Sequence, residues 1–582
     1  MEKINLTING LAVEAEKGET IMVAAERLGF RIPKICFTEM QNTGITIKPV
    51  TCRVCEVEVG DGKIMAACVA PVKEGMEVKI NSKLAQDSRR KRLEDILADH
   101  PLDCLTCVRN MSCQLQTLAM EFGIREITPT GLRPVYEIDA SSHSLVRDQN
   151  KCIYCRRCDA VCSEVQAVYA LESVGKGYEA MVVTSNSAPL GNTMCVFCGQ
   201  CAAVCPTGAI SIKDDTKIAW EALHDADKHV VVQIAPAVRT GLGEAFGLSP
   251  GENAVGKLNT ALRLLGFDKV FTTNFAADMT IMEEATELVK RLTKGGTLPM
   301  ITSCCPSWVK FAEDNYGDML EHISSCKSPA AMLGSVLKTY YSDKVGIDKS
   351  NIVSIFIAPC TAKKFEMKRE ELAGDVDIVL TTQEISKMIK ESAIDFLNLA
   401  DSGFDNVFGE ESGAGQIFGV TGGVMQAALR TAYETVTNKR LDDRVLTFEP
   451  LMGFEGSGIK EATVDMNGTE IKVAVAHELR NAVKLMNDIR AGTSPYHFIE
   501  IMACPGGCVN GGGQPYHTFS TDTVSKRSDV LYSEDVKNTL RRSHENEELK
   551  RLYDEFLGEP YYGENAHKLL HTTYKARNSV KA

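Results

Sequence analysis

The sequence predicts a multidomain protein that combines α+β and α/β domains. The chain has 582 residues, too many for a single hydrophobic core. Its 21 cysteines form several groups with short, regular spacings. Beyond residue 215, short apolar runs alternate with helical segments, as they do in α/β domains. We therefore expect four domains, with bounds 1–80, 81–125, 126–215 and 216–582.

Composition excludes several classes of protein. The net charge of −13 argues against nucleic acid as a partner. No apolar run approaches the roughly 18 residues of a membrane span, and the first residues lack the apolar core of a signal peptide. We therefore expect a cytoplasmic protein without a membrane segment. Cysteines in such a protein rarely form disulfides, so metal binding is the best explanation for most of the 21.

The first domain is expected to be rich in strands. Residues 3–13 alternate around Asn9-Gly10, a strong hairpin signal, and a helix is expected over 20–28. This order of elements resembles a plant-type ferredoxin, although the first two cysteine spacings depart from the common C-x4-C-x2-C pattern. The domain can hold a 2Fe–2S cluster or, alternatively, a zinc ion. Its four candidate ligands are Cys36, Cys52, Cys55 and Cys68.

The second domain begins with a charged helix and continues with Cys104, Cys107 and Cys113. Three thiols alone would leave a 4Fe–4S site incomplete. His100 can supply the fourth donor, and histidine in place of a thiolate makes a cluster less negative, as in Rieske centres. The alternative is that His100 is only a turn residue before a proline.

The third domain carries the least ambiguous motif, the bacterial ferredoxin run C-x2-C-x2-C-x3-C, and carries it twice. In that arrangement the fourth cysteine of each run binds the cluster of the other run. Zinc is a poor explanation for eight cysteines at these separations. We expect two 4Fe–4S clusters, bound by Cys152, Cys155, Cys158 and Cys205, and by Cys195, Cys198, Cys201 and Cys162.

The fourth domain is expected to contain several buried strands. A helix is expected to begin at Thr280, which could form a capping box with Glu283. The expected strands cover 230–234, 270–273, 298–302, 352–357, 377–380 and 498–502.

Three of these strands lead directly to cysteines. Ligand sites of open α/β sheets lie at the carboxyl ends of strands, so one common site is expected there. Glycines such as Gly506 and Gly507 would let the backbone approach it closely. Its candidate ligands are Cys304 or Cys305, Cys360, Cys504 and Cys508.

Cys304 and Cys305 are adjacent, and a disulfide between neighbours would be strained. They could be two buried thiols in a core turn, followed by a helix that starts at Pro306. If one of them is a ligand, the other is a candidate acid/base group with an ordinary pKa of about 8.5. Cys326 has no assigned role and is expected to be a small buried thiol.

Three motifs in the fourth domain together resemble the signatures of FeFe-hydrogenases. They are Thr302-Ser-Cys-Cys-Pro-Ser-Trp308, Pro359-Cys360-Thr-Ala-Lys363-Lys-Phe-Glu366 and Glu500-Ile-Met-Ala-Cys504-Pro-Gly-Gly-Cys508. The resemblance extends over essentially the whole chain and is closest to the monomeric clostridial type with four accessory clusters. It implies a two-lobed α/β catalytic domain with the H-cluster in the cleft between the lobes.

The resemblance also implies roles for individual residues. Cys305, together with the other three cysteines of the common site, would hold the 4Fe–4S half of the H-cluster. Cys508 would also bridge to the diiron half, which carries carbon monoxide, cyanide and azadithiolate. Cys304 would transfer protons, and Lys363 would hydrogen-bond a cyanide rather than be a solvated surface charge. The residues expected to pack around the diiron unit are Met502, Ala235 and Pro236.

A proton path is partly suggested by spacing. Glu284 and Glu287 share one face of a helix, and Arg291 is four residues beyond Glu287. Periodicity alone is also compatible with an ordinary charged helix surface. The resemblance favours a relay from solvent to Cys304 through Arg291, Glu287, Ser324 and Glu284.

The function implied by the resemblance is reversible reduction of protons to H2. The implied cofactors are one 2Fe–2S cluster, three accessory 4Fe–4S clusters and the H-cluster. Ferredoxin would be the electron partner, dedicated maturases would insert the diiron unit, and the protein is expected to be a monomer.

Two departures from the family keep alternatives open. Ala358 stands where the family usually has methionine, and Ala330 stands where it often has glutamine. A hydrogen sensor or a catalytically tuned variant is therefore an alternative. An electron-transfer subunit of the complex I type would lack the three motifs, and an iron–sulfur assembly protein would lack the proton-transferring cysteine at 304.

Overall fold

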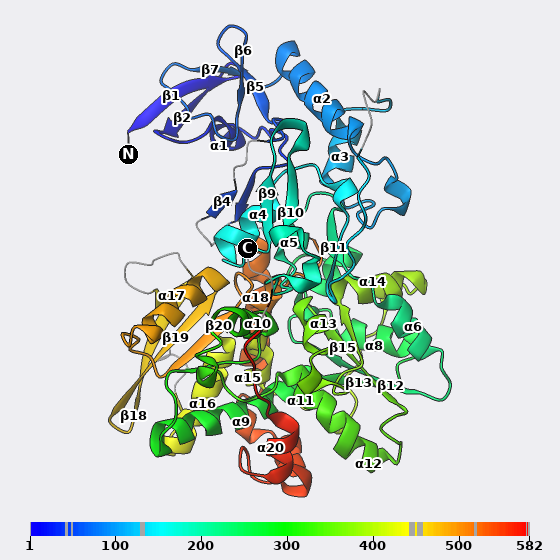
Figure 1. Cartoon of the computed structure of the whole chain (residues 1–582), viewed down its shortest axis with the longest axis vertical. Helices are drawn as coiled ribbons and strands as arrows, with labels where there is room; N and C mark the ends of the chain where they lie inside the picture. Colours follow the sequence, from blue (N-terminus) through cyan, green and yellow to red (C-terminus); the bar gives the residue numbers. More distant parts are fainter. Residues whose placement is uncertain are drawn as a thin grey trace.

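The computed structural model describes residues 2–40, 45–47, 51–127, 134–441, 448–450, 458–516, 521–577 and 579. Figure 1 shows the chain as a column, with the N-terminal sheet at the top and residues 134–215 below it. The last part of the chain forms two lobes at the bottom, with β12, β13 and β15 on one side and β18, β19 and β20 on the other. This arrangement agrees with the predicted combination of α+β and α/β domains.

The N-terminal sheet has the strand order β2-β1-β7-β5-β6. The predicted hairpin is confirmed, because β1 and β2 pair around Asn9 and Gly10, which have φ values of 49° and 81°. The predicted helix is α1, and the Thr20 side chain caps it by accepting from Val23 N at 3.4 Å. The bounds are β1 Lys3–Ile8, β2 Leu11–Glu16, α1 Ile21–Arg27, β3 Thr38–Met40, β4 Ile45–Ile47, β5 Glu56–Val59, β6 Lys63–Ala66 and β7 Glu77–Lys79.

The next two segments are small and depend on contacts between them. Arg109 is buried and donates hydrogen bonds to the carbonyls of Ala202, Cys205 and Thr207. Its guanidinium also lies 3.3 Å from the ring centroid of Tyr516. One side chain thus joins three parts of the chain. The bounds are α2 Lys83–Ala98, α3 Gln114–Glu121, β8 Leu145–Arg147, α4 Arg157–Ala160, β9 Leu171–Val174, β10 Met181–Thr184, α5 Gln200–Val204 and β11 Ile210–Ile212.

The remainder of the chain is built on two separate sheets. The first is fully parallel, with the order β13-β12-β15-β16. The second has the order β14-β20-β19-β18-β17, in which β14, β20 and β19 are parallel. The bounds are β12 His229–Ile234, β13 Lys269–Thr272, β14 Met300–Ile301, β15 Ile352–Ala358, β16 Ile378–Thr381, β17 Glu449–Pro450, β18 Ile459–Met466, β19 Thr469–His477 and β20 Phe498–Met502. The hairpin of β18 and β19 is absent from the sequence-based expectations, although Asn467-Gly468 carries the same signal as Asn9-Gly10.

Helices cover both sheets, and α9 is the longest of the part that the structure describes. It packs against α11, α15 and α16. The bounds are α6 Thr216–Leu223, α7 Val238–Gly241, α8 Val255–Leu265, α9 Thr273–Lys294, α10 Pro306–Asn315, α11 Pro329–Val336, α12 Ser342–Val345, α13 Ala362–Glu366, α14 Thr382–Glu391, α15 Gly413–Gln416, α16 Gly423–Thr437, α17 Leu479–Arg490, α18 Thr521–Lys537, α19 Glu547–Leu552 and α20 Glu564–Leu570. No helix among the described residues is long and apolar enough to span a membrane.

The predicted start of α9 at Thr280 is wrong. The helix begins directly after β13, where the Thr272 side chain accepts from Asn274 N at 3.2 Å. Thr280 lies inside the helix and donates to Ala276 O at 2.9 Å. The capping-box pattern is local, and here the junction with the preceding strand decides where the helix starts.

We expect Arg109→Ala to destabilise the cluster-bearing segments by at least about 2 kcal/mol, because buried carbonyls would lose their donor. Arg109→Lys is the control, and it should cause a smaller loss because a single amine cannot reproduce the guanidinium fork. Unfolding by denaturant, monitored through the visible absorbance of the clusters, would measure both effects. Identical midpoints for Arg109→Ala and wild type would contradict the proposed anchoring.

Candidate functional site

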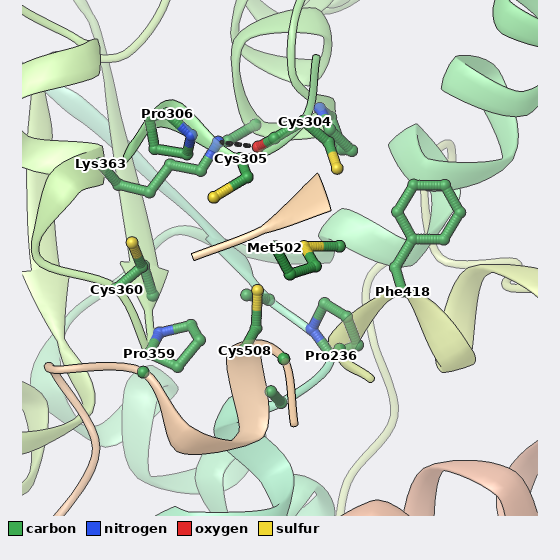
Figure 2. Close-up of a pocket in the computed structure, with 18 of the residues that line it drawn as sticks. Pro236, Cys304, Cys305, Pro306, Pro359, Cys360, Lys363, Phe418, Met502 and Cys508 are labelled. Atoms are coloured by element: carbon green, nitrogen blue, oxygen red, sulfur yellow. Dashed lines mark hydrogen bonds between the residues drawn. The ribbon is translucent and has the colours of Figure 1, made fainter. Parts of the chain in front are cut away.

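Thiols from both lobes meet in one pocket. Cys305 follows β14, Cys360 follows β15, and Cys504 and Cys508 follow β20. Figure 2 shows the sulfur atoms of Cys305, Cys360 and Cys508 pointing toward a common space. Burial raises the pKa of Cys504, and the neighbouring thiols Cys360, Cys508 and Cys305 raise it further. The expected convergence of strand ends is therefore observed.

The donor set fits an iron–sulfur cluster. Burial raises the pKa of Cys360 to about 12, and it also raises the pKa of Cys305. Such thiols become thiolates only when a cation binds them. The rest of the pocket is largely apolar and includes Pro236, Phe418 and Met502. An iron–sulfur cluster bound by these thiols would therefore lie in surroundings that exclude water.

Cys304 differs from its neighbour Cys305 in its surroundings. Figure 2 places Cys304 across the pocket from Cys360, on the side where Phe418 lies. Burial raises the pKa of Cys304 well above its ordinary value, and the carboxyl group of Glu284 raises it further. The two adjacent thiols are therefore not equivalent.

Lys363 is a buried cation in the pocket wall. Its amine donates to Cys304 O at 3.3 Å and to Glu366 Oε2 at 2.7 Å. Burial lowers the pKa of Lys363, but the Glu366 carboxylate outweighs this effect, and the net shift is upward. The alternative of a solvated surface charge is wrong, because Lys363 is only 8% exposed.

The other expected pocket residues also line the cavity. Ala235, Pro236 and Met502 are among its lining residues. Ala358 and Ala330, the two departures from the family pattern, line the same cavity. Both substitutions therefore change the wall of this pocket and leave its thiols in place.

A line of acidic and hydroxyl groups leads away from Cys304. Arg291 donates to Glu287 Oε1 at 2.6 Å, and Ser324 Oγ donates to Glu287 Oε2 at 3.0 Å. Burial raises the pKa of Glu284 to about 8, Glu287 raises it too, and a hydrogen bond with Ser324 opposes the shift. Atom Oε2 of Glu284 has no hydrogen-bond partner among the described residues. Glu284 and Glu287 are 1% and 2% exposed, so they do not form a charged helix surface.

The cysteines of the third segment form two groups, as the crossed ligand pattern predicts. Each group lines its own small cavity. Burial raises the pKa of Cys201, and its neighbours Cys198, Cys195 and Cys162 raise it further. The groups are Cys152, Cys155, Cys158 and Cys205, and Cys162, Cys195, Cys198 and Cys201.

The first two candidate cluster sites are less closely defined. Cys55 Sγ donates to Cys68 Sγ at 3.3 Å, and Cys36 and Cys52 contact each other through a hydrogen bond. All four of these thiols are buried. In the next segment Cys104, Cys107 and Cys113 are half-buried and His100 is buried. Ligation by His100 stays a prediction.

Direct contacts join the third segment to the thiol pocket. Gln200 Nε2 donates to Cys504 Sγ at 3.3 Å, and Thr361 Oγ1 donates to Phe197 O at 2.7 Å. A Cβ atom at Gly512 would lie 2.6 Å from Cys198 O, so the close approach requires glycine. Sequence reasoning did not identify Gln200 or Thr361, because their partners are distant in sequence.

Buried thiol clusters and a polar line that ends at one thiol define this class of protein as an iron–sulfur oxidoreductase. Comparisons with known proteins identify the family. The chain matches the model for the iron only hydrogenase large subunit, C-terminal domain, over residues 228–512, and that for the iron hydrogenase small subunit over 521–577. Residues 1–83 match a 2Fe-2S iron-sulfur cluster binding domain, 89–128 match the NADH-ubiquinone oxidoreductase-G iron-sulfur binding region, and 151–209 match a 4Fe-4S dicluster domain.

Individual relatives agree with these matches. The chain is 46% identical over its full length to the NADP-reducing hydrogenase subunit HndD of Solidesulfovibrio fructosivorans, and the match covers all of that protein. It is 40% identical to iron hydrogenase 1 of Clostridium pasteurianum, over 98% of this chain and 99% of that protein. Among solved structures, [FeFe]-hydrogenase HydA1 from Chlamydomonas reinhardtii is 42% identical, with a TM-score of 0.57, over 62% of this chain and 99% of that chain.

The chain belongs to the iron-only, or FeFe, hydrogenase family. It is a hydrogenase of the clostridial type with ferredoxin-like 2Fe–2S and 4Fe–4S domains and an H-cluster catalytic fold. The sensor alternative, raised by Ala358, is not favoured by these similarities.

The pKa of Glu284 predicts a pH dependence for hydrogen evolution. A carboxyl group with a pKa of about 8 carries its proton at pH 7 and loses it as the pH rises through about 8. We expect hydrogen evolution to fall over that pH range, and the infrared band of the protonated Glu284 carboxyl group to disappear over the same range. Glu284→Gln should lack this band at every pH and should lose most activity while retaining its clusters. A Glu284→Gln variant with wild-type turnover would contradict the role of this residue.

Proposed function

We propose that this hydrogenase interconverts protons and H2 at an H-cluster held by Cys305, Cys360, Cys504 and Cys508. When bound, the H-cluster would supply the redox chemistry, through a 4Fe–4S half and a diiron half with carbon monoxide, cyanide and azadithiolate ligands. Lys363 is a buried donor in the pocket wall and is suited to hydrogen-bond a cyanide ligand. Met502, Ala235 and Pro236 would exclude water from the diiron half.

Proton transfer is proposed to run from Arg291 through Glu287, Ser324 and Glu284 to Cys304. The observation that carries this proposal is that Glu287 and Glu284 are both buried, and that Glu284 raises the pKa of the Cys304 thiol. Arg291 orients Glu287, which accepts from the Ser324 hydroxyl. Glu284 holds a proton near neutral pH and can pass it to Cys304.

Electrons are proposed to reach the pocket through four accessory clusters, one 2Fe–2S and three 4Fe–4S, of which one has His100 as a ligand. The thiol of Cys198, in the third segment, lies close enough to Cys504 to raise the pKa of that cysteine. Ferredoxin is the proposed electron partner. Similarity to an NADP-reducing hydrogenase subunit favours a second candidate, a companion subunit that exchanges electrons with a nicotinamide.

The protein would act in the cytoplasm as a monomer, after dedicated maturases have inserted the diiron unit. The domain bounds are proposed as 1–80, 81–125, 126–215 and 216–582. Size measurement of the purified protein, with and without ferredoxin, would test the oligomeric state.

The division of roles between adjacent thiols can be tested directly. We expect Cys304→Ala to retain the H-cluster infrared bands and to lose at least about 99% of turnover, since an essential proton-transfer group contributes 10²- to 10⁴-fold. Cys305→Ala should instead lose or alter the bands, because a ligand is missing. If both variants lose the bands, the proposed separation between proton transfer and ligation is wrong.

The electron path can be tested at Gly512. A methyl group there would meet Cys198 O and Gly199 Cα, each at 2.6 Å, and would push the cluster-bearing segment away from the pocket. We expect Gly512→Ala to lower hydrogen evolution by about tenfold, equivalent to about 1.4 kcal/mol in the barrier. Isotope exchange between D2 and water needs no external electrons and should persist.

The control is Gly403→Ala, because a Cβ atom at Gly403 has no neighbour within 4 Å. This variant should match wild type in both assays. Equal loss of exchange and evolution in Gly512→Ala would point to damage at the pocket instead of slower electron transfer.

A further inference from the structure

Cys326 is a buried thiol next to the proposed proton line, and it has no role in that line. It is 0% exposed. Glu287, Cys326 and His571 each offer one ligand atom, and the three atoms lie within 4.8 Å of one another. They come from α9, from the segment before α11, and from the residue that follows α20. Oxygen, sulfur and nitrogen donors thus converge from three separate elements.

His571 is oriented as metal-binding histidines usually are. Its Nε2 atom lies 2.9 Å from Glu283 Oε2, and its Nδ1 atom lies 2.8 Å from Ser325 Oγ. A carboxylate on one ring nitrogen fixes the tautomer and leaves the other nitrogen for a ligand contact. Glu283 is itself buried and held by Tyr553 Oη and by Tyr561 N. The ring is therefore positioned by a rigid carboxylate.

Ser325 completes the set of donors. Its hydroxyl contacts Glu287 Oε2 at 3.2 Å as well as the His571 ring. It consequently lies between two of the three candidate ligands. The four side chains of Glu287, Ser325, Cys326 and His571 thus provide four donors, the number that a tetrahedral zinc ion requires.

The charge around Cys326 favours a cation. Burial raises the pKa of the thiol well above its ordinary value, and Glu287, Glu284 and Glu283 raise it further. Arg291 is a positive group at this cluster, and it pairs with Glu287. A divalent cation would compensate the carboxylates and would displace the thiol proton.

We propose that Glu287, Cys326 and His571, with Ser325, form an inhibitory site for Zn²⁺ or a similar borderline-soft divalent ion. Mixed nitrogen, oxygen and sulfur donors select this class of metal. Binding releases one proton from Cys326 and involves no change of oxidation state. A metal-bound Glu287 carboxylate has to stay deprotonated and cannot take up the proton that it would pass on, so the proton line is interrupted. This consequence rests on the proposed proton role of Glu287.

The test uses matured holoenzyme titrated with Zn²⁺. Equilibrium dialysis should find one more equivalent on wild type than on Cys326→Ala. The zinc X-ray absorption signal of wild type, after subtraction of the Cys326→Ala signal, should show a Zn–S distance of about 2.3 Å and a Zn–N distance of about 2.0–2.1 Å. Hydrogen evolution by wild type should be inhibited, and Cys326→Ala should keep its basal evolution and resist inhibition.

Two further variants make the result specific. Glu283→Gln removes only the carboxylate behind His571 and should weaken zinc affinity by about 10- to 100-fold, the usual effect of an outer-shell partner. His571→Gln should abolish the extra equivalent and serves as the second ligand variant if Cys326→Ala fails to fold. The same zinc stoichiometry and inhibition in wild type, Cys326→Ala and His571→Gln would overturn the site.

The outcome also separates this site from the proposed function. If zinc binds at the site without inhibiting hydrogen evolution, the proposed interruption of proton transfer and the proton role of Glu287 would be overturned, while the metal site itself would stand. If Glu284→Gln loses turnover as predicted, but wild type binds no more zinc than Cys326→Ala, the metal site alone would be overturned.

Discussion

The desolvation of thiols is the constraint on which the rest of the structure depends. The cysteines of the pocket and of the third segment are buried or half-buried. Desolvation raises the pKa of Cys305, Cys360 and Cys504, with corresponding shifts at Cys158 and Cys201. Without a cation, such groups stay protonated and bind one another only weakly. Metal binding therefore contributes directly to the stability of these segments. The two lobes supply different ligands, so their mutual position and the integrity of the pocket depend on each other.

The geometry would keep the proposed electron path and the proposed proton path apart. The third segment contacts the pocket beside Cys504, through Gln200. The polar line approaches from the opposite element, α9, and ends at Cys304. Cys304 and Cys504 follow neighbouring strands of the second sheet, β14 and β20. One sheet can thus present both reactants to the same cavity from different directions.

The features of the structure that could be predicted from the sequence are mostly those that depend on local patterns. The cysteine runs of the third segment predict the observed groups because iron–sulfur ligands follow short spacings. The ends of β15 and β20 are predicted by apolar runs that stop at cysteines. The Thr280 cap fails because strand β13 passes directly into α9. Gln200 could not be found in advance, since its partner Cys504 is 304 residues away and only tertiary packing brings them together.

The hydrogen bond from Gln200 to Cys504 Sγ has a consequence for the energy of the transferred electron. Hydrogen bonds to cluster sulfur stabilise the more negative, reduced state and so raise the reduction potential. The donor belongs to the third segment, whereas the acceptor belongs to the catalytic fold. An accessory domain would therefore set part of the driving force at the centre it serves. A catalytic fold expressed without that domain would operate at a lower potential, even with every cluster ligand in place.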